Sequence, residues 1–253
     1  MKKFTQIVYS IMPFCEALLI MVLVYSILTA VFTTYYDLGV IPVEVGYIIP
    51  VIAAIITGIV FFFWYKRTEK PIIKEEIKKI SSIKVLLLLV LLGIGCQFFA
   101  SGAISIISRV FPEVFKEYDV LMDANYQGNP VVVAIYLVLL APVTEELIFR
   151  GMTMAKSREV LPFLGANLLQ ASLFGIYHWN PVQSAYAFLN GLLFGYIYKK
   201  FGTLLAPVLL HIVINASSYL IMSFNETKIT VIMITLIGGA FLSGAMIFIM
   251  RRK

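Results

Sequence analysis

This chain contains eight long runs of apolar residues, and these runs constrain its fold more than any other feature of the sequence. A helix of about 20 residues spans the roughly 30 Å hydrocarbon core of a bilayer. Because that core offers no water to satisfy backbone N–H and C=O groups, a helix is the expected structure of each run. The runs are placed at residues 7–33, 43–65, 84–108, 130–153, 163–179, 182–198, 204–223 and 229–250.

The overall composition excludes an ordinary water-soluble domain. Hydrophobic residues make up 60% of the 253 residues and charged residues only 13%, against roughly 45–50% and 25% in soluble proteins. The first run follows Lys2 and Lys3 as a signal peptide would, but it is too long for a signal-peptide core and lacks a small-residue cleavage site. The sequence therefore predicts an all-α, polytopic helical bundle in which residues 1–253 form a single transmembrane domain of about eight helices.

Basic residues predict how the bundle is oriented, because Lys and Arg near the ends of spans stay in the cytoplasm. All but four of the basic residues fall on one side if the N-terminus is inside: Lys2, Lys3, Lys66, Arg67, Lys70, Lys74, Lys78, Lys79, Lys84, Lys156, Arg158, Lys199, Lys200, Arg251, Arg252 and Lys253. The predicted outer loop at 111–128 is acidic. We therefore expect cytoplasmic N- and C-termini. The net charge of +6 then reflects topology and contact with the lipid bilayer, and it does not indicate nucleic-acid binding.

Ionisable residues inside the fourth run point to a functional site, because each such group costs at least about 2.5–3.5 kcal/mol at membrane depth. Glu146 and Arg150 are four residues apart, so they share a helix face and can form an ion pair. Glu145 is turned about 100° away from that face. Glu145 is thus suited to act as a general base in a polar cavity. The alternative is that all three residues form a structural charge cluster.

The only two histidines of the chain, His178 and His211, also fall within apolar runs. Imidazole can transfer a proton near neutral pH or bind a metal. Asn215 lies four residues after His211, on the same helix face, so the two could hold a developing oxyanion. Counting residues from the cytoplasmic turns places Glu145, His178 and His211 at a similar depth, on the order of 15 Å below the charged boundary. Each histidine could instead be a packed helix residue.

The residue pattern favours hydrolysis by an activated water. The chain has no G-x-S-x-G elbow and no H-E-x-x-H zinc motif. A water activated by Glu145 with His178 is the economical mechanism, and it requires no cofactor. A zinc ion bound by Glu145, His178 and His211 is the alternative. A proton-coupled transporter is a third class, although the sequence shows no inverted repeat. Phe174, one turn before His178, is expected to form a wall that orients the imidazole.

Three motifs in order resemble the CAAX-protease and bacteriocin-processing family, which includes the type II prenyl endopeptidases. They are E-E-x-x-x-R at Glu145, Glu146 and Arg150, F-x-x-x-H at Phe174 and His178, and H-x-x-x-N at His211 and Asn215. The resemblance covers residues 140–220, which we expect to form the catalytic core. It implies that the first Glu activates water with help from the first His, that the second His and the Asn stabilise the oxyanion, that the Glu–Arg pair supports the site, and that no catalytic metal is needed.

The expected function is that of an intramembrane endopeptidase working near the cytoplasmic membrane face on a membrane-associated peptide or protein. Within the resembling family this means CAAX-type processing, peptide or bacteriocin processing, or self-immunity. A non-proteolytic immunity or scaffold protein is the alternative. The small size, short loops and Lys- and Ile-rich composition favour a bacterial cell membrane.

Overall fold

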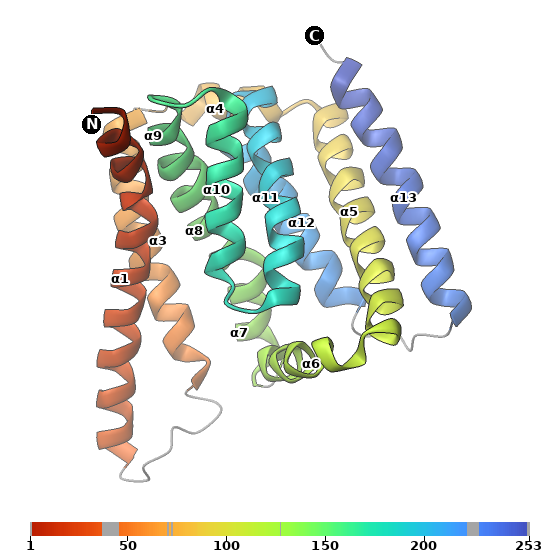
Figure 1. Ribbon diagram of the computed structural model, residues 1–253, viewed down its shortest axis with the longest axis horizontal. Helices are drawn as coiled ribbons and strands as arrows, with labels where there is room; N and C mark the ends of the chain where they lie inside the picture. Colours follow the sequence, from red (N-terminus) through yellow and green to blue (C-terminus); the bar gives the residue numbers. More distant parts are fainter. Residues whose placement is uncertain are drawn as a thin grey trace.

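The computed structural model describes residues 2–36, 46–69, 71, 73–126, 128–221 and 228–251, and this part of the chain contains helices and no strand. The helices outside residues 130–221 are α1 (Lys2–Tyr36), α3 (Ile48–Glu69), α4 (Ile73–Ile80), α5 (Ile83–Val110), α6 (Pro112–Tyr126) and α13 (Lys228–Arg251). The centre is formed by α7 (Pro130–Ala134), η1 (Ile135–Leu140), α8 (Ala141–Glu146), η2 (Leu147–Met154), α9 (Ala155–Arg158), α10 (Phe163–Tyr177), α11 (Pro181–Phe201) and α12 (Leu205–Ile221). Figure 1 shows these helices side by side.

The architecture is that of a helical membrane protein. Four helical segments are long and apolar enough to cross a bilayer, namely residues 5–35, 48–69, 83–110 and 130–158. Three shorter apolar helices cover 163–177, 205–221 and 233–249. Each of the eight predicted runs falls on one helical segment where the structure describes it; residues 43–45 and 222–223 of two runs lie outside the described residues. The all-helical fold is confirmed, whereas eight crossings and cytoplasmic termini stay predictions.

Small residues let the helices approach closely, as is common inside membranes. A side chain at Gly95 of α5 would meet the backbone of α13, and one at Gly238 of α13 would meet the backbone of α5. In the α10–α11 hairpin, a side chain at Gly191 would lie 3.0 Å from Ala171, and one at Gly195 would overlap Asn167. The glycines of α11 therefore set the spacing of the two helices that frame the site.

The segment at 111–128 differs from the prediction, because it is largely a helix instead of a loop. Helix α6 runs from Pro112 to Tyr126 and lies across the lower end of the bundle in Figure 1. Its buried or half-buried positions include Phe115, Tyr118, Leu121 and Met122, which are spaced three or four residues apart except for the adjacent last two. This spacing is that of one amphipathic face, and it was overlooked because the segment is too polar to register as an apolar run.

Candidate active site

The acidic motif lies in a helical segment with unusual winding. Two π-helical stretches, η1 and η2, flank the short α-helix α8, which carries Glu145 and Glu146. Wide π-helical turns are often found at functional sites, because they reorient side chains relative to a regular helix. The hydroxyl of Thr144 donates a hydrogen bond to the carbonyl of Ala54 at 3.1 Å, which fastens α8 to α3.

Glu146 and Arg150 form the ion pair that their spacing predicts. Arg150 Nη1 lies 2.8 Å from Glu146 Oε1, and both side chains are fully buried. The guanidinium carbon of Arg150 is 4.6 Å from the ring centroid of Phe174 and 4.9 Å from that of Phe194. Cation–π contact and ion pairing together offset the desolvation of this charge. The buried ion pair and these two aromatic rings form a solvent-excluded layer, the dry layer, next to the site.

Glu145 lies outside this dry layer and faces a cavity. Its Oε2 atom is 3.7 Å from His211 Nε2, which is too long for a direct hydrogen bond. His211 Nδ1, on the other side of the ring, lies 2.9 Å from Glu146 Oε1. Because a carboxylate paired with arginine can only accept, Nδ1 is the donor and Nε2 is the atom presented to Glu145. The ring of His211 also stacks on Phe194, with centroids 4.7 Å apart.

His178 is positioned by the end of its own helix. As the C-terminal cap of α10, it has Nδ1 2.8 Å from the carbonyl oxygen of Phe174. A backbone carbonyl only accepts hydrogen bonds, so Nδ1 carries the proton and the neutral ring keeps Nε2 as an acceptor. The ring of Phe174 packs edge-on against His178 at 4.9 Å and against His211 at 5.9 Å. Phe174 thus contacts both imidazoles, and its role in orienting His178 stays a prediction.

Asn215 is engaged differently from the sequence-based expectation. Its side-chain Nδ2 donates to the carbonyl oxygen of Leu137 in η1 at 2.8 Å. His211 is hydrogen-bonded to Glu146 instead, so the histidine and the amide do not form one isolated pair. Each N–H of a primary amide can donate separately, and Asn215 also lines the cavity. Asn215 therefore links the π-helical turn to the site.

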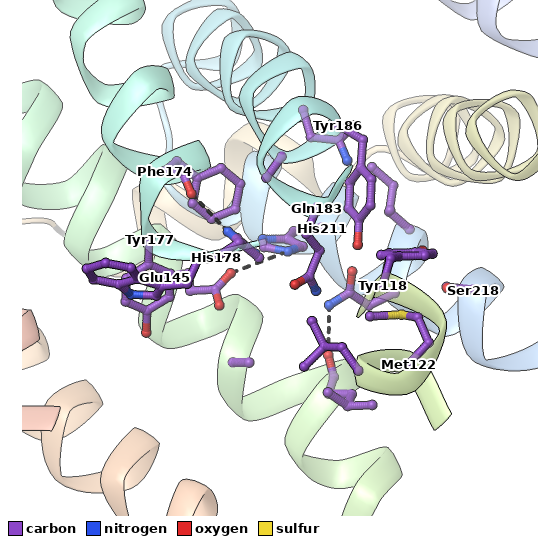
Figure 2. Close-up of a pocket in the computed structure, with 18 of the residues that line it drawn as sticks. Tyr118, Met122, Glu145, Phe174, Tyr177, His178, Gln183, Tyr186, His211 and Ser218 are labelled. Atoms are coloured by element: carbon purple, nitrogen blue, oxygen red, sulfur yellow. Dashed lines mark hydrogen bonds and ion pairs between the residues drawn. The ribbon is translucent and has the colours of Figure 1, made fainter. Parts of the chain in front are cut away.

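A cavity of about 980 Å³ connects the predicted residues, since Glu145, Phe174, His178, His211 and Asn215 all line it. Figure 2 shows Glu145, His178 and His211 close together, with Tyr118 and Met122 of α6 across the cavity. The Glu146 and Arg150 side chains lie behind this wall and do not line the cavity.

Sequence reasoning missed several aromatic residues in the lining, among them Tyr118, Tyr136, Tyr177 and Tyr186. The hydroxyl of Tyr177 contacts the sulfur of Met21 at 2.8 Å, which brings α1 to the cavity. Tyr177 directly precedes His178, so its place near the site could have been inferred. The place of the α6 residues near the site could not have been inferred, because that segment was expected to be a loop.

The cavity reaches helix α6, and access from the cytoplasmic side stays a prediction. It is lined by residues of α6 and by residues from the middle of the bundle, such as Phe194 and His211. The basic residues of α4, α9 and the end of α11 lie at the opposite end of the bundle (Figure 1). Entry from the basic, cytoplasmic end was expected from residue counting alone, which fixes the depth of the side chains but not the side on which a cavity opens.

The described residues offer little support for the alternative zinc site. No group of three His, Cys, Asp or Glu side chains in that part of the chain has the placement to hold a metal ion. Glu145 and His211 approach each other, but His211 also donates to Glu146. We therefore derive no catalytic step through a metal.

Comparison with known proteins supports the resemblance seen in the motifs. Residues 127–217 match the family model described as type II CAAX prenyl endopeptidase Rce1-like. The matched segment contains every residue of the three motifs, so the resemblance is confirmed over this segment. The chain matches no curated protein and no solved structure. This protein is thus a helical membrane protein with a segment typical of an intramembrane protease family.

Proposed function

We propose that this protein is an intramembrane endopeptidase that hydrolyses a peptide bond in a membrane-associated peptide or protein. The observation that carries the proposal is the separation of two adjacent acids. Glu146 is neutralised by Arg150 in a dry layer, while Glu145 faces a cavity shared with His178. Substrates of the CAAX type, peptide or bacteriocin precursors, and peptides removed in self-immunity all fit this reaction. The proposed location is a bacterial cytoplasmic membrane.

In the proposed mechanism, Glu145 removes a proton from a water whose second hydrogen is bound by His178 Nε2. The water oxygen attacks the scissile carbonyl carbon, and the carbonyl electrons move onto its oxygen. The second N–H of Asn215 donates to this oxyanion. His211 Nε2 becomes a further donor when the ring is protonated, with the Glu146 carboxylate as its counter-charge at Nδ1. Collapse of the intermediate breaks the C–N bond, and Glu145 returns its proton to the leaving amine.

The proposal is tested by comparing peptides from membranes of cells that produce wild-type protein or the Glu145→Gln variant. Mass spectrometry identifies peptides whose cleavage depends on Glu145, and these become substrates for purified protein in nanodiscs. Loss of a general base typically costs about 10²–10⁴-fold in rate, so Glu145→Gln and His178→Ala should lose cleavage. Glu117→Gln, on an exposed position of α6 outside the cavity, is the control. Wild-type rates in both site variants would refute the peptidase.

A non-proteolytic immunity or scaffold role is the second candidate, and the buried polar network favours it. Gly191 O accepts hydrogen bonds from Gln170 at 2.8 Å and Arg150 at 3.4 Å, and Asn167 donates to Leu192 O at 3.0 Å. These hydrogen bonds hold η2, α10 and α11 together, and this structural role requires no catalytic activity. A cell-protection assay separates the two roles. Protection that survives Glu145→Ala at normal expression supports the scaffold.

A further inference from the structure

The cavity extends from the middle of the bundle to helix α6. Most of the lining residues of the long helices lie in their middle or nearer to α6: α1 contributes residues 18–26, α5 contributes 97–105, α11 contributes 183–194 and α12 contributes 211–221. Helix α6 itself contributes Tyr118, Asp119, Leu121, Met122 and Asp123. Because the lining residues Asp119 and Asp123 of α6 are exposed, we take the mouth of the cavity to be at the α6 end. Helix α6 lies across the lower end of the bundle in Figure 1.

A dry layer closes the other side of the cavity. Ile148, Phe149, Arg150 and Met152 of η2 are fully buried, and Phe194 of α11 covers the guanidinium of Arg150. Beyond this layer lie the basic residues at the ends of α3, α9 and α11. The positive-inside rule assigns that basic end to the cytoplasm. A substrate coming from the cytoplasm would have to pass through the layer that holds the buried ion pair.

The charge of the lining restricts what can enter. Among the residues that line the cavity, Asp119, Asp123 and Glu145 are acidic and none is Lys or Arg. Asp119 and Asp123 are exposed on α6, whereas Glu145 lies at the inner wall. A free C-terminal carboxylate would meet only like charge along this path. Lys or Arg side chains would be attracted at the mouth, and their apolar neighbours could contact Leu121 and Met122 on the same helix.

One strained residue marks the rim of the mouth. Trp179, next to His178, has a positive φ of 56° and 78% of its surface exposed, and it lines the cavity. Bulky residues rarely adopt this conformation, and surroundings that hold them in it are often functional. An indole at this position gives an apolar peptide a flat surface beside the acidic residues.

We propose that the cavity admits its substrate from the non-cytoplasmic face, and that this substrate is a positively charged, partly apolar peptide segment. Asp119 and Asp123 attract its Lys or Arg side chains, and Trp179 contacts its apolar residues. The inference deepens the proposed function, since it takes the cavity around Glu145 as the substrate site. The binding of such a peptide does not depend on turnover.

The first experiment tests the side of access. In a Cys15→Ala, Cys96→Ala background, Gln183→Cys reports on the cavity mouth, and Lys74→Cys reports on the exposed face of α4 at the basic end. A membrane-impermeant maleimide should label Gln183→Cys in intact cells and Lys74→Cys in inverted vesicles. A short Lys–Leu peptide should protect Gln183→Cys from labelling, and a matched Glu–Leu peptide should not. Labelling of Gln183→Cys only from the cytoplasmic face overturns the proposed entry.

The second experiment tests charge selection by measuring fluorescent peptide binding to protein in nanodiscs of neutral lipid. The Asp119→Asn, Asp123→Asn double variant should bind the Lys–Leu peptide on the order of tenfold more weakly, because two attractive charges are lost. The matched control is the Glu113→Gln, Glu117→Gln double variant, which loses the same charge on the same helix outside the cavity. Equal weakening in both variants, or displacement of the peptide by anionic lipid, overturns the proposal. Binding without any cleavage would refute the peptidase alone.

Discussion

Glu145 and Glu146 follow one another in the chain, yet His211 touches both from opposite sides of its ring: Nδ1 is 2.9 Å from Glu146 Oε1, and Nε2 is 3.7 Å from Glu145 Oε2. One carboxylate belongs to a dry ion pair and the other to a cavity. Two adjacent residues thus have different environments: Glu146 belongs to an ion pair inside the fold, and Glu145 faces the cavity in which the proposed chemistry takes place. This difference allows the two acids to be tested against each other with the same substitution.

The Glu146→Gln variant should be much less stable than the Glu145→Gln variant. Removing the Glu146 charge leaves the fully buried Arg150 without its ion-pair partner, and breaking a buried pair costs about 3–5 kcal/mol. Loss of the Glu145 charge leaves no buried arginine unpaired, because Glu145 faces the cavity and has only a 3.7 Å contact with His211. Thermal unfolding in detergent, followed by size-exclusion chromatography, measures the difference. Similar midpoints for the two variants would show that the pair does not stabilise the fold.

The Gly195→Ala substitution should separate α10 from α11. A methyl group there would overlap the side-chain amide of Asn167, which donates to Leu192 O. Overpacking of this kind costs typically about 1–3 kcal/mol. Gly165→Ala is the matched control in α10, because its methyl would lie at an ordinary 3.5 Å from Leu161. We expect a lower thermal midpoint for Gly195→Ala alone; an unchanged midpoint would mean that the amide can move aside at no cost.

Much of this architecture follows from local sequence, and the parts that do not follow have physical reasons. The apolar runs predict the helices because, in a bilayer core without water, the backbone N–H and C=O groups must form hydrogen bonds within the helix. The four-residue spacing predicts the Glu146–Arg150 pair. The apolar runs do not predict helix α6, because its many polar residues interrupt any such run. The position of His211 between two acids depends on helix packing. The side on which the cavity opens depends on where α6 lies, which no spacing within a helix reveals.

The Asn215→Ala variant should lose catalysis more than stability. The Asn215 amide donates to Leu137 O within the π-helical stretch η1, and its second N–H is the proposed oxyanion donor. Removing such a donor elsewhere costs about 10²–10³-fold in kcat. We expect a comparable loss in kcat with little change in KM, measured on the peptide identified by mass spectrometry. A change in KM alone would assign Asn215 to substrate binding.

Treatment with a chelator should leave hydrolysis intact. No three metal-binding side chains converge among the described residues, and the proposed water is activated by Glu145 and His178 alone. The experiment is dialysis of the purified protein against a strong zinc chelator, followed by the cleavage assay and elemental analysis. Loss of activity that added Zn²⁺ restores would instead support the ligand set of Glu145, His178 and His211.

Trp179→Gly should weaken peptide binding without lowering stability. Glycine adopts the positive φ of 56° observed at this position without the strain that an L side chain feels, so the thermal midpoint should stay the same or rise. The exposed indole would be lost from the rim of the cavity, and binding of the Lys–Leu peptide should weaken. Trp179→Phe, which keeps an aromatic ring, is the control and should retain most of the affinity. If Trp179→Gly lowers the thermal midpoint while affinity is unchanged, the indole serves as an interfacial membrane anchor and does not contact the substrate.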